Sequence, residues 1–281
     1  MCKQEEITLK GKYKGKKIYF YLHIPKTAGT TFNDFLKKSF PFNSTVFHIE
    51  SKLEEIEAKR VLSGHIVLPR AKKIIPNFTE YTTLTVLRKP IEQLSSHLRY
   101  VRKLAEPSEA HRLLAHTDAI KKIVAQLQET DFASPSSLKI FITWLEDENL
   151  ALFHNTQIQY LIGSRFTINK EQLAEAKEEL NGIDYVGVTE RLDDYMDYLS
   201  YKLNFKKNKV KNKKLNITIE TYGLDINNKE IQKVLEPLIC YDKIIYDEAK
   251  KKFEKDFCLV VKNRPKGFHL FLDKMRAIAK R

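Results

Sequence analysis

The chain has 281 residues, of which 42% are hydrophobic and 30% charged, and this balance excludes wholesale disorder. Its formal net charge of +13 favours anionic partners such as a nucleotide, an anionic glycan or a nucleic acid. No apolar run is long enough to span a membrane, and the three widely spaced cysteines fit neither a zinc site nor a disulfide framework. We therefore expect a soluble, cytoplasmic protein.

The first predicted strand and the first predicted helix enclose a short loop. Residues 18–24 form a continuous apolar and aromatic run, which is typical of a strand buried on both faces. Residues 25–29 interrupt this run. Residues 30–40 then place four apolar side chains on one face of a helix. The unit is a strand, a tight loop and a helix.

Further strands follow along the chain. Residues 80–87 are rich in β-branched side chains and predict a second core strand, after which Pro90 is well placed for the first turn of a helix. Shorter strands are predicted at residues 60–63 and 184–188. Strands that alternate with helices predict an α/β fold, with a three-layer parallel sheet and flanking helices.

The remaining segments are predicted to be mainly helical. One helix is expected to be capped by Asn169 and closed by Gly182, and others cover the polar stretch 105–162 and residues 190–203 and 238–257. There is no internal repeat and no convincing linker. We therefore predict a single domain over residues 1–281.

The loop between the first strand and helix has the chemistry of a phosphate cradle. The start of a helix presents free N–H groups and the positive end of its dipole. Lys26 adds a full charge, Gly29 allows a close approach of the backbone to an anion, and Thr30 and Thr31 can cap the helix or donate hydroxyls. The lysine precedes the glycine, so the loop lacks the spacing of nucleoside triphosphatases.

The whole string of residues 23–31, His-Ile-Pro-Lys-Thr-Ala-Gly-Thr-Thr, closely resembles the 5′-phosphosulfate loop of the sulfotransferase superfamily. It is most similar to the branch that contains heparan sulfate 2-O-sulfotransferase and related carbohydrate enzymes. The donor of these enzymes is 3′-phosphoadenosine-5′-phosphosulfate (PAPS), and their fold is P-loop-like. The resemblance implies that the phosphosulfate end of the donor is bound by Lys26, Thr27, Ala28, Gly29, Thr30 and Thr31.

A second motif resembles the site for the other end of the donor. Residues 85–97 are similar to the family's 3′-phosphate motif, and by that resemblance Arg88 and Ser96 bind the 3′-phosphate. An arginine fork and a hydroxyl suit a dianionic phosphate. The family commonly has an acidic residue at the position of Lys89. The lysine in this chain adds surface charge and leaves the phosphate contact unchanged.

Weaker similarity extends over much of the chain. It covers a core of about residues 18–255 and leaves the tail at 262–281 without an assignment. The stretches that carry it are residues 155–163, 186–194, 216–218 and 241–247.

Sulfuryl transfer needs a cation for the leaving phosphate and a base for the acceptor hydroxyl. Lys26 is the candidate cation, because an ammonium near the bridging oxygen stabilises charge as the S–O bond breaks. His65 is the candidate base, because it follows a predicted strand end and resembles the Gly-His that carries the base in the 2-O-sulfotransferase branch. His23 fits a packing role better, while His97 stays open, as does a carboxylate base, either Glu50 or another.

The function expected from the resemblance is transfer of a sulfuryl group from PAPS to a hydroxyl, without a metal and with release of adenosine 3′,5′-bisphosphate. A carbohydrate acceptor is favoured by analogy with the branch. One alternative is a small-molecule kinase that uses Mg²⁺. Another is a basic module that binds glycan or nucleic acid through the lysine-rich residues 206–214, although that stretch has no interleaved aromatic residues.

Overall fold

The computed structural model describes residues 16–163, 167–205 and 222–263. The basic stretch 206–214, the family-like residues 216–218 and the tail at 262–281, apart from its first two residues, lie outside these residues. None of the helices within the described ranges is long and apolar enough to cross a membrane.

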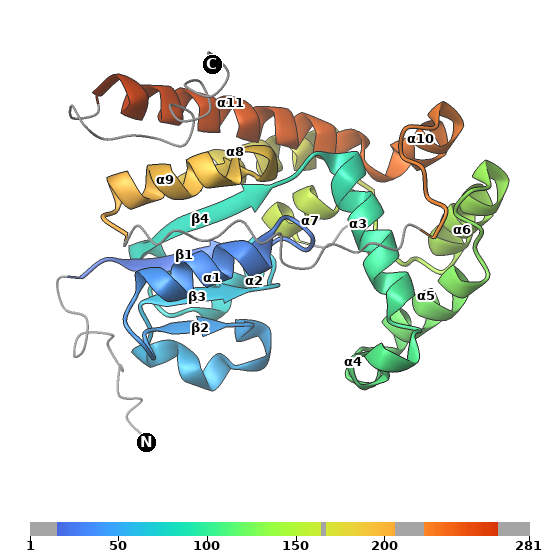
Figure 1. Ribbon diagram of the computed structural model, residues 1–281, viewed down its shortest axis with the longest axis horizontal. Coiled ribbons are helices and arrows are strands. Elements are labelled where there is room, and N and C mark those ends of the chain that lie inside the picture. Colours follow the sequence, from blue (N-terminus) through green and yellow to red (C-terminus); the bar gives the residue numbers. More distant parts are fainter. Residues whose placement is uncertain (1–15, 164–166, 206–221, 264–281) are drawn as a thin grey trace, which may run out of the picture.

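The centre of the molecule is a five-stranded, entirely parallel sheet with the strand order β2-β3-β1-β4-β5 (Figure 1). Its members are β1 (Ile18–Leu22), β2 (Thr45–Phe47), β3 (Val61–Gly64), β4 (Tyr81–Leu87) and β5 (Tyr185–Val188). β1 is buried along its whole length and pairs with β3 on one side and β4 on the other. The predicted α/β class with a parallel sheet is confirmed.

The α-helices alternate with the strands and then extend beyond the sheet. They are α1 (Gly29–Ser39), α2 (Leu68–Ile74), α3 (Pro90–Lys103), α4 (Ala110–Leu114), α5 (Asp118–Gln128), α6 (Pro135–Asp147), α7 (Thr156–Ile162), α8 (Lys170–Gly182), α9 (Leu192–Lys202), α10 (Lys229–Leu235) and α11 (Cys240–Asn263).

Helices cover both faces of the sheet. Successive side chains of a strand point to opposite faces, and Tyr21 of β1 contacts Phe32 of α1, which stacks on Tyr195 of α9. Phe20 points the other way and packs against Phe78. Helix α2 contacts the turn that carries Phe78 and so lies on this second face, and α7 packs against both α2 and α8. The long helix α11 packs against β5, α8 and α9, and Figure 1 shows it running beside these two helices.

A second hydrophobic cluster lies beside the sheet and is built by helices alone. Leu94, Leu98 and Val101 of α3 pack there against α5, α6 and α10. This apolar face of α3 is the one that the sequence pattern predicts. The opposite side of α3 is therefore left for the edge of the sheet, where the candidate site lies.

Most predicted elements are confirmed within one or two residues. Asn169 and Gln172 form a capping box at the start of α8, and that helix ends at Gly182 as expected. β2 was not predicted, because three residues are too few to show a periodicity. The helix predicted from residue 30 begins one residue earlier, at Gly29.

Candidate functional site

The candidate site lies at the carboxyl edge of the three central strands. Lys26 follows β1, His65 follows β3 and Arg88 follows β4, and these strands are direct neighbours in the sheet. Loops at the carboxyl ends of parallel strands form the usual ligand crevice of open α/β sheets. The fold therefore brings together three predicted site residues that are far apart in the chain.

The loop between β1 and α1 has an unusual backbone. Lys26 and Ala28 have φ values of 65° and 63°, in the left-handed region that non-glycine residues seldom adopt. Thr27 lies between them, fully buried, and its hydroxyl donates a hydrogen bond of 2.9 Å to the carbonyl of Ile24. The Thr27 hydroxyl thus holds the loop, and its contact with Ile24 does not require a ligand.

The start of α1 differs in detail from the expectation. Its N-cap residue is Ala28, which makes no side-chain capping bond, so neither Thr30 nor Thr31 caps the helix. Gly29, Thr30 and Thr31 instead form the first turn, whose N–H groups have no carbonyl partner within the helix. This turn places free amides at the edge of the sheet, where an anion can accept from them.

Gly29 is needed because of a neighbouring histidine. A Cβ at this position would lie 1.6 Å from Nε2 of His23. His23 follows β1, is buried, and stacks on Tyr21 with ring centroids 5.5 Å apart. Its packing role is therefore confirmed, and this packing holds the start of α1 close to the end of β1.

The ammonium of Lys26 lies 4.3 Å from the centroid of the Tyr100 ring on α3, a cation–π contact. Burial, together with the nearby charges of Arg88, Arg99 and Lys103, lowers the pKa of Lys26 to about 8. A partly desolvated cation among other cations favours the approach of an anion.

Arg88 contacts the loop between β1 and α1, and its backbone is held by the side chain of a glutamine. Its Nη1 donates to the carbonyl of Lys26 at 3.3 Å, and its Nε lies 3.4 Å from Oε2 of Glu92. The side chain of Gln157 accepts from the N–H of Arg88 at 2.9 Å and donates to its carbonyl at 2.8 Å. The two predicted donor motifs are thus directly connected in space.

Gln157 is in turn held where the first turns of α7 and α11 meet, because a side chain from each segment accepts backbone N–H groups of the other. The carboxylate of Asp242 accepts from the N–H groups of Gln157 and Ile158 at 3.1 and 2.8 Å. Oδ1 of Asn155 accepts from the N–H groups of Tyr241 and Asp242 at 2.9 and 3.1 Å. Sequence reasoning missed this support, although Asn155 and Asp242 lie in two of the weaker family-like stretches.

Ser96, the other residue expected at the 3′-phosphate, lies on α3 and is partly buried. It is one helical turn before Tyr100, and residues four apart lie on the same face of a helix. Ser96 therefore shares the face of α3 that reaches Lys26.

His65 has the hydrogen-bond geometry of a base. Its Nδ1 lies 2.8 Å from the carbonyl of His23, and because a carbonyl only accepts, Nδ1 carries the proton. In the neutral ring Nε2 is then left with its lone pair. Burial lowers the pKa of His65, so the imidazole is neutral near pH 7 and able to take a proton.

The other candidates for the base are also placed. Glu50 lies beside His65 and its Oε2 accepts the backbone N–H of His65 at 3.0 Å. His97 is buried on α3 against Phe153, and burial lowers its pKa to about 3. His97 therefore packs as a neutral ring and does not change charge near pH 7.

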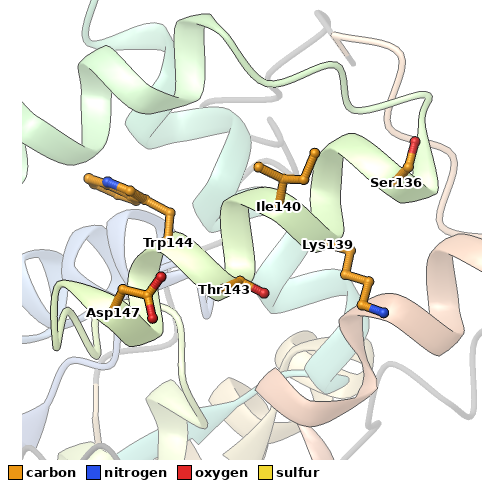
Figure 2. A pocket seen from close by; sticks show the side chains of 6 residues that line it. All are labelled: Ser136, Lys139, Ile140, Thr143, Trp144 and Asp147. Atoms are coloured by element: carbon orange, nitrogen blue, oxygen red, sulfur yellow. The ribbon is translucent and has the colours of Figure 1, made fainter.

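A separate open hollow lies along the outer helix α6, and Figure 2 shows its lining. None of the predicted site residues contributes to it. Its lining residues are Ser136, Lys139, Ile140, Thr143, Trp144 and Asp147.

A scan against models of protein families matched none of them, and a search of curated proteins returned no significant match.

Proposed function

We propose that the protein is a sulfotransferase with a P-loop-like fold that transfers the sulfuryl group of PAPS to a hydroxyl, with a carbohydrate as the favoured acceptor. The first turn of α1 and Lys26 bind the phosphosulfate end of the donor. Arg88 and Ser96 bind its 3′-phosphate. His65 acts as the general base.

The single observation that carries this proposal is the link between the two donor motifs. The guanidinium of Arg88 donates to the carbonyl of Lys26, so the residues proposed for the two ends of one nucleotide form a continuous surface. Gln93, on the same helix as Ser96, donates to the carbonyl of Pro25 at 3.0 Å and joins the motifs a second time. Two resemblances in sequence thus gain support from one spatial arrangement.

The chemistry follows from the charges at this edge of the sheet. Nε2 of His65 takes the proton of the acceptor hydroxyl, and the oxygen attacks sulfur as the bond from sulfur to the bridging oxygen breaks. The ammonium of Lys26 stabilises the negative charge that develops on the leaving phosphate. The products are the sulfated acceptor and adenosine 3′,5′-bisphosphate.

The proposal is tested by calorimetric titration of the full chain with adenosine 3′,5′-bisphosphate in the absence of metal. We expect binding that is weakened by Arg88→Ala, while Lys37→Ala, a change of an exposed lysine at the far end of α1, leaves the affinity unchanged. A parallel screen of sugars with radiolabelled PAPS identifies the acceptor. In that assay His65→Ala should lower turnover by roughly 10²–10⁴-fold and leave nucleotide binding intact.

Two results would overturn the proposal. The first is a well-folded chain that does not bind the bisphosphate. The second is Mg²⁺-dependent turnover of ATP, which would make the protein a kinase.

A further inference from the structure

Glu50 has an unusual set of partners for a glutamate near the surface. It lies in η1 (Ile49–Ser51), a short 3₁₀ turn after β2, and its side chain is 29% exposed. Oε2 accepts the backbone N–H of His65 at 3.0 Å, and Oε1 lies 3.3 Å from Nδ1 of His48. Both carboxylate oxygens are therefore engaged, which does not suit Glu50 itself as the base.

Gly64 leaves the space that this carboxylate occupies. A Cβ at Gly64 would lie 2.3 Å from Oε2 of Glu50 and 2.7 Å from Cγ1 of Ile49. The glycine that precedes His65 is thus matched to the position of Glu50. The contact joins Glu50, in the turn after β2, to Gly64, the last residue of β3.

The charges around His65 come from several elements, and Glu50 supplies the negative one. The groups that face His65 are His23 at the end of β1, Lys26 in the following loop, His48 before η1 and His97 on α3. These groups are neutral or positive. Tyr160 of α7, which faces Glu50, is a phenol whose pKa burial raises, so it also stays neutral.

The effect of each group on His65 follows from its charge. Burial lowers the pKa of His65, and the charge of Glu50 is the largest influence that raises it again, followed by the hydrogen bond to the carbonyl of His23. Lys26 and His48 lower it. When His65 takes a proton, the new imidazolium therefore has one neighbouring anion to stabilise it.

We propose that Glu50 is the positioning residue of His65, holding the main chain of the base through its N–H and stabilising the imidazolium that forms when the acceptor loses its proton. His48 contacts the other oxygen of the Glu50 carboxylate and helps to hold it in place. This inference rests on the proposed function, because it takes His65 as the base of sulfuryl transfer.

The decisive variant is Glu50→Gln, because an amide oxygen can still accept the N–H of His65 but carries no charge. We expect the titration of the His65 ring, followed by NMR in the free protein, to move to lower pH by roughly one pH unit. The acidic limb of the kcat/KM profile should move in the same direction. Turnover on the plateau should fall, since a weaker base takes the proton less readily, and binding of adenosine 3′,5′-bisphosphate should not change.

The matched control is Glu54→Gln, which removes the same charge from the exposed side of the next turn, η2 (Leu53–Ala58). It should leave the His65 titration and the acidic limb in place. If Glu50→Gln does not fold, Glu50→Asp replaces it. That variant withdraws the carboxylate by one methylene, and we expect a smaller shift in the same direction.

The results separate this inference from the proposed function. If the nucleotide binds and sulfate is transferred, but the His65 titration and the acidic limb are the same with and without the Glu50 charge, the inference is overturned and the function stands. If the native chain neither binds the nucleotide nor transfers sulfate, the function fails and the inference falls with it, whatever coupling the NMR titration still measures between Glu50 and His65.

Discussion

The ammonium of Lys26 rests 4.3 Å from the centroid of the Tyr100 ring, and this cation–π contact is one of the links between the loop after β1 and the helix after β4. The proposed catalytic cation lies beside Arg88, Arg99 and Lys103, and its pKa is lowered first by burial and then by these charges. The free protein therefore concentrates positive charge at the place where the proposed donor has its phosphates.

The first prediction concerns the alkaline limb of the kcat/KM profile, which reports on the free enzyme. The pKa of Lys26 is lowered to about 8, so its charge is present below this pH and is lost above it. We expect activity to fall as the pH rises through about 8. Lys26→Arg should remove this limb while lowering the rate, because a guanidinium keeps its charge.

The control for this prediction is Tyr100→Phe, which keeps the aromatic ring beneath the ammonium and should retain the alkaline limb. If the alkaline limb of the Lys26→Arg profile lay at the same pH as in the native protein, the limb would belong to another group and the prediction would be wrong.

A second prediction concerns the close approach of His23 to Gly29. Gly29→Ala places a Cβ where Nε2 of His23 lies, so the ring or the start of α1 has to move. We expect loss of most of the affinity for adenosine 3′,5′-bisphosphate, measured by calorimetry, together with a lower melting temperature.

Gly182→Ala is the matched control, because nothing lies within 4 Å of a Cβ at the end of α8. It should leave nucleotide binding intact and add about 0.4–1 kcal/mol of stability through the lower entropy of the unfolded chain. Native affinity in Gly29→Ala would contradict the argument from packing.

The third prediction tests the clamp on the backbone of Arg88. Gln157→Met has a similar length but leaves the N–H and carbonyl of Arg88 without these partners. Each buried group left unpaired costs roughly 1–3 kcal/mol. We expect a matching loss in the free energy of unfolding by urea and a weaker affinity for the nucleotide.

Gln126→Met, a change at a half-buried position of α5, should alter the stability by no more than about 0.5 kcal/mol. If Gln157→Met lost stability but bound the nucleotide with full affinity, Gln157 would support the fold without positioning Arg88.

The fourth prediction is a dependence of stability on pH that comes from Asp242. Burial raises the pKa of Asp242 to about 7, although the two backbone amides that donate to its carboxylate lower this pKa. The unfolded chain gives up this proton near pH 4, so the contribution of Asp242 to the free energy of unfolding falls as the pH rises from about 4 to 7. Asp242→Asn should flatten this slope in urea denaturation series; an unchanged slope would show that Asp242 is ionised throughout.

Much of the fold and part of the site follow from local sequence patterns. The continuous apolar runs of β1 and β4 indicate buried parallel strands, and Pro90 and Asn169 mark helix starts, because these signals depend on near neighbours in the chain. The loop with Lys26 and Gly29 was predicted as a candidate site from its local chemistry, and Arg88 from the resemblance of residues 85–97 to a family motif. β2 was missed because it has only three residues.

What the sequence alone determined, therefore, is the order of the elements and the identity of the charged residues at the strand ends. Only the tertiary structure decided that His23 fills the space beside Gly29, that Gln157 clamps Arg88 from 69 residues away, and that Glu50 lies against His65. Such contacts depend on the order of strands in the sheet and on the packing of helices across it. No periodicity or local turn chemistry encodes them, because the partners are distant in the chain and meet only when the sheet has formed.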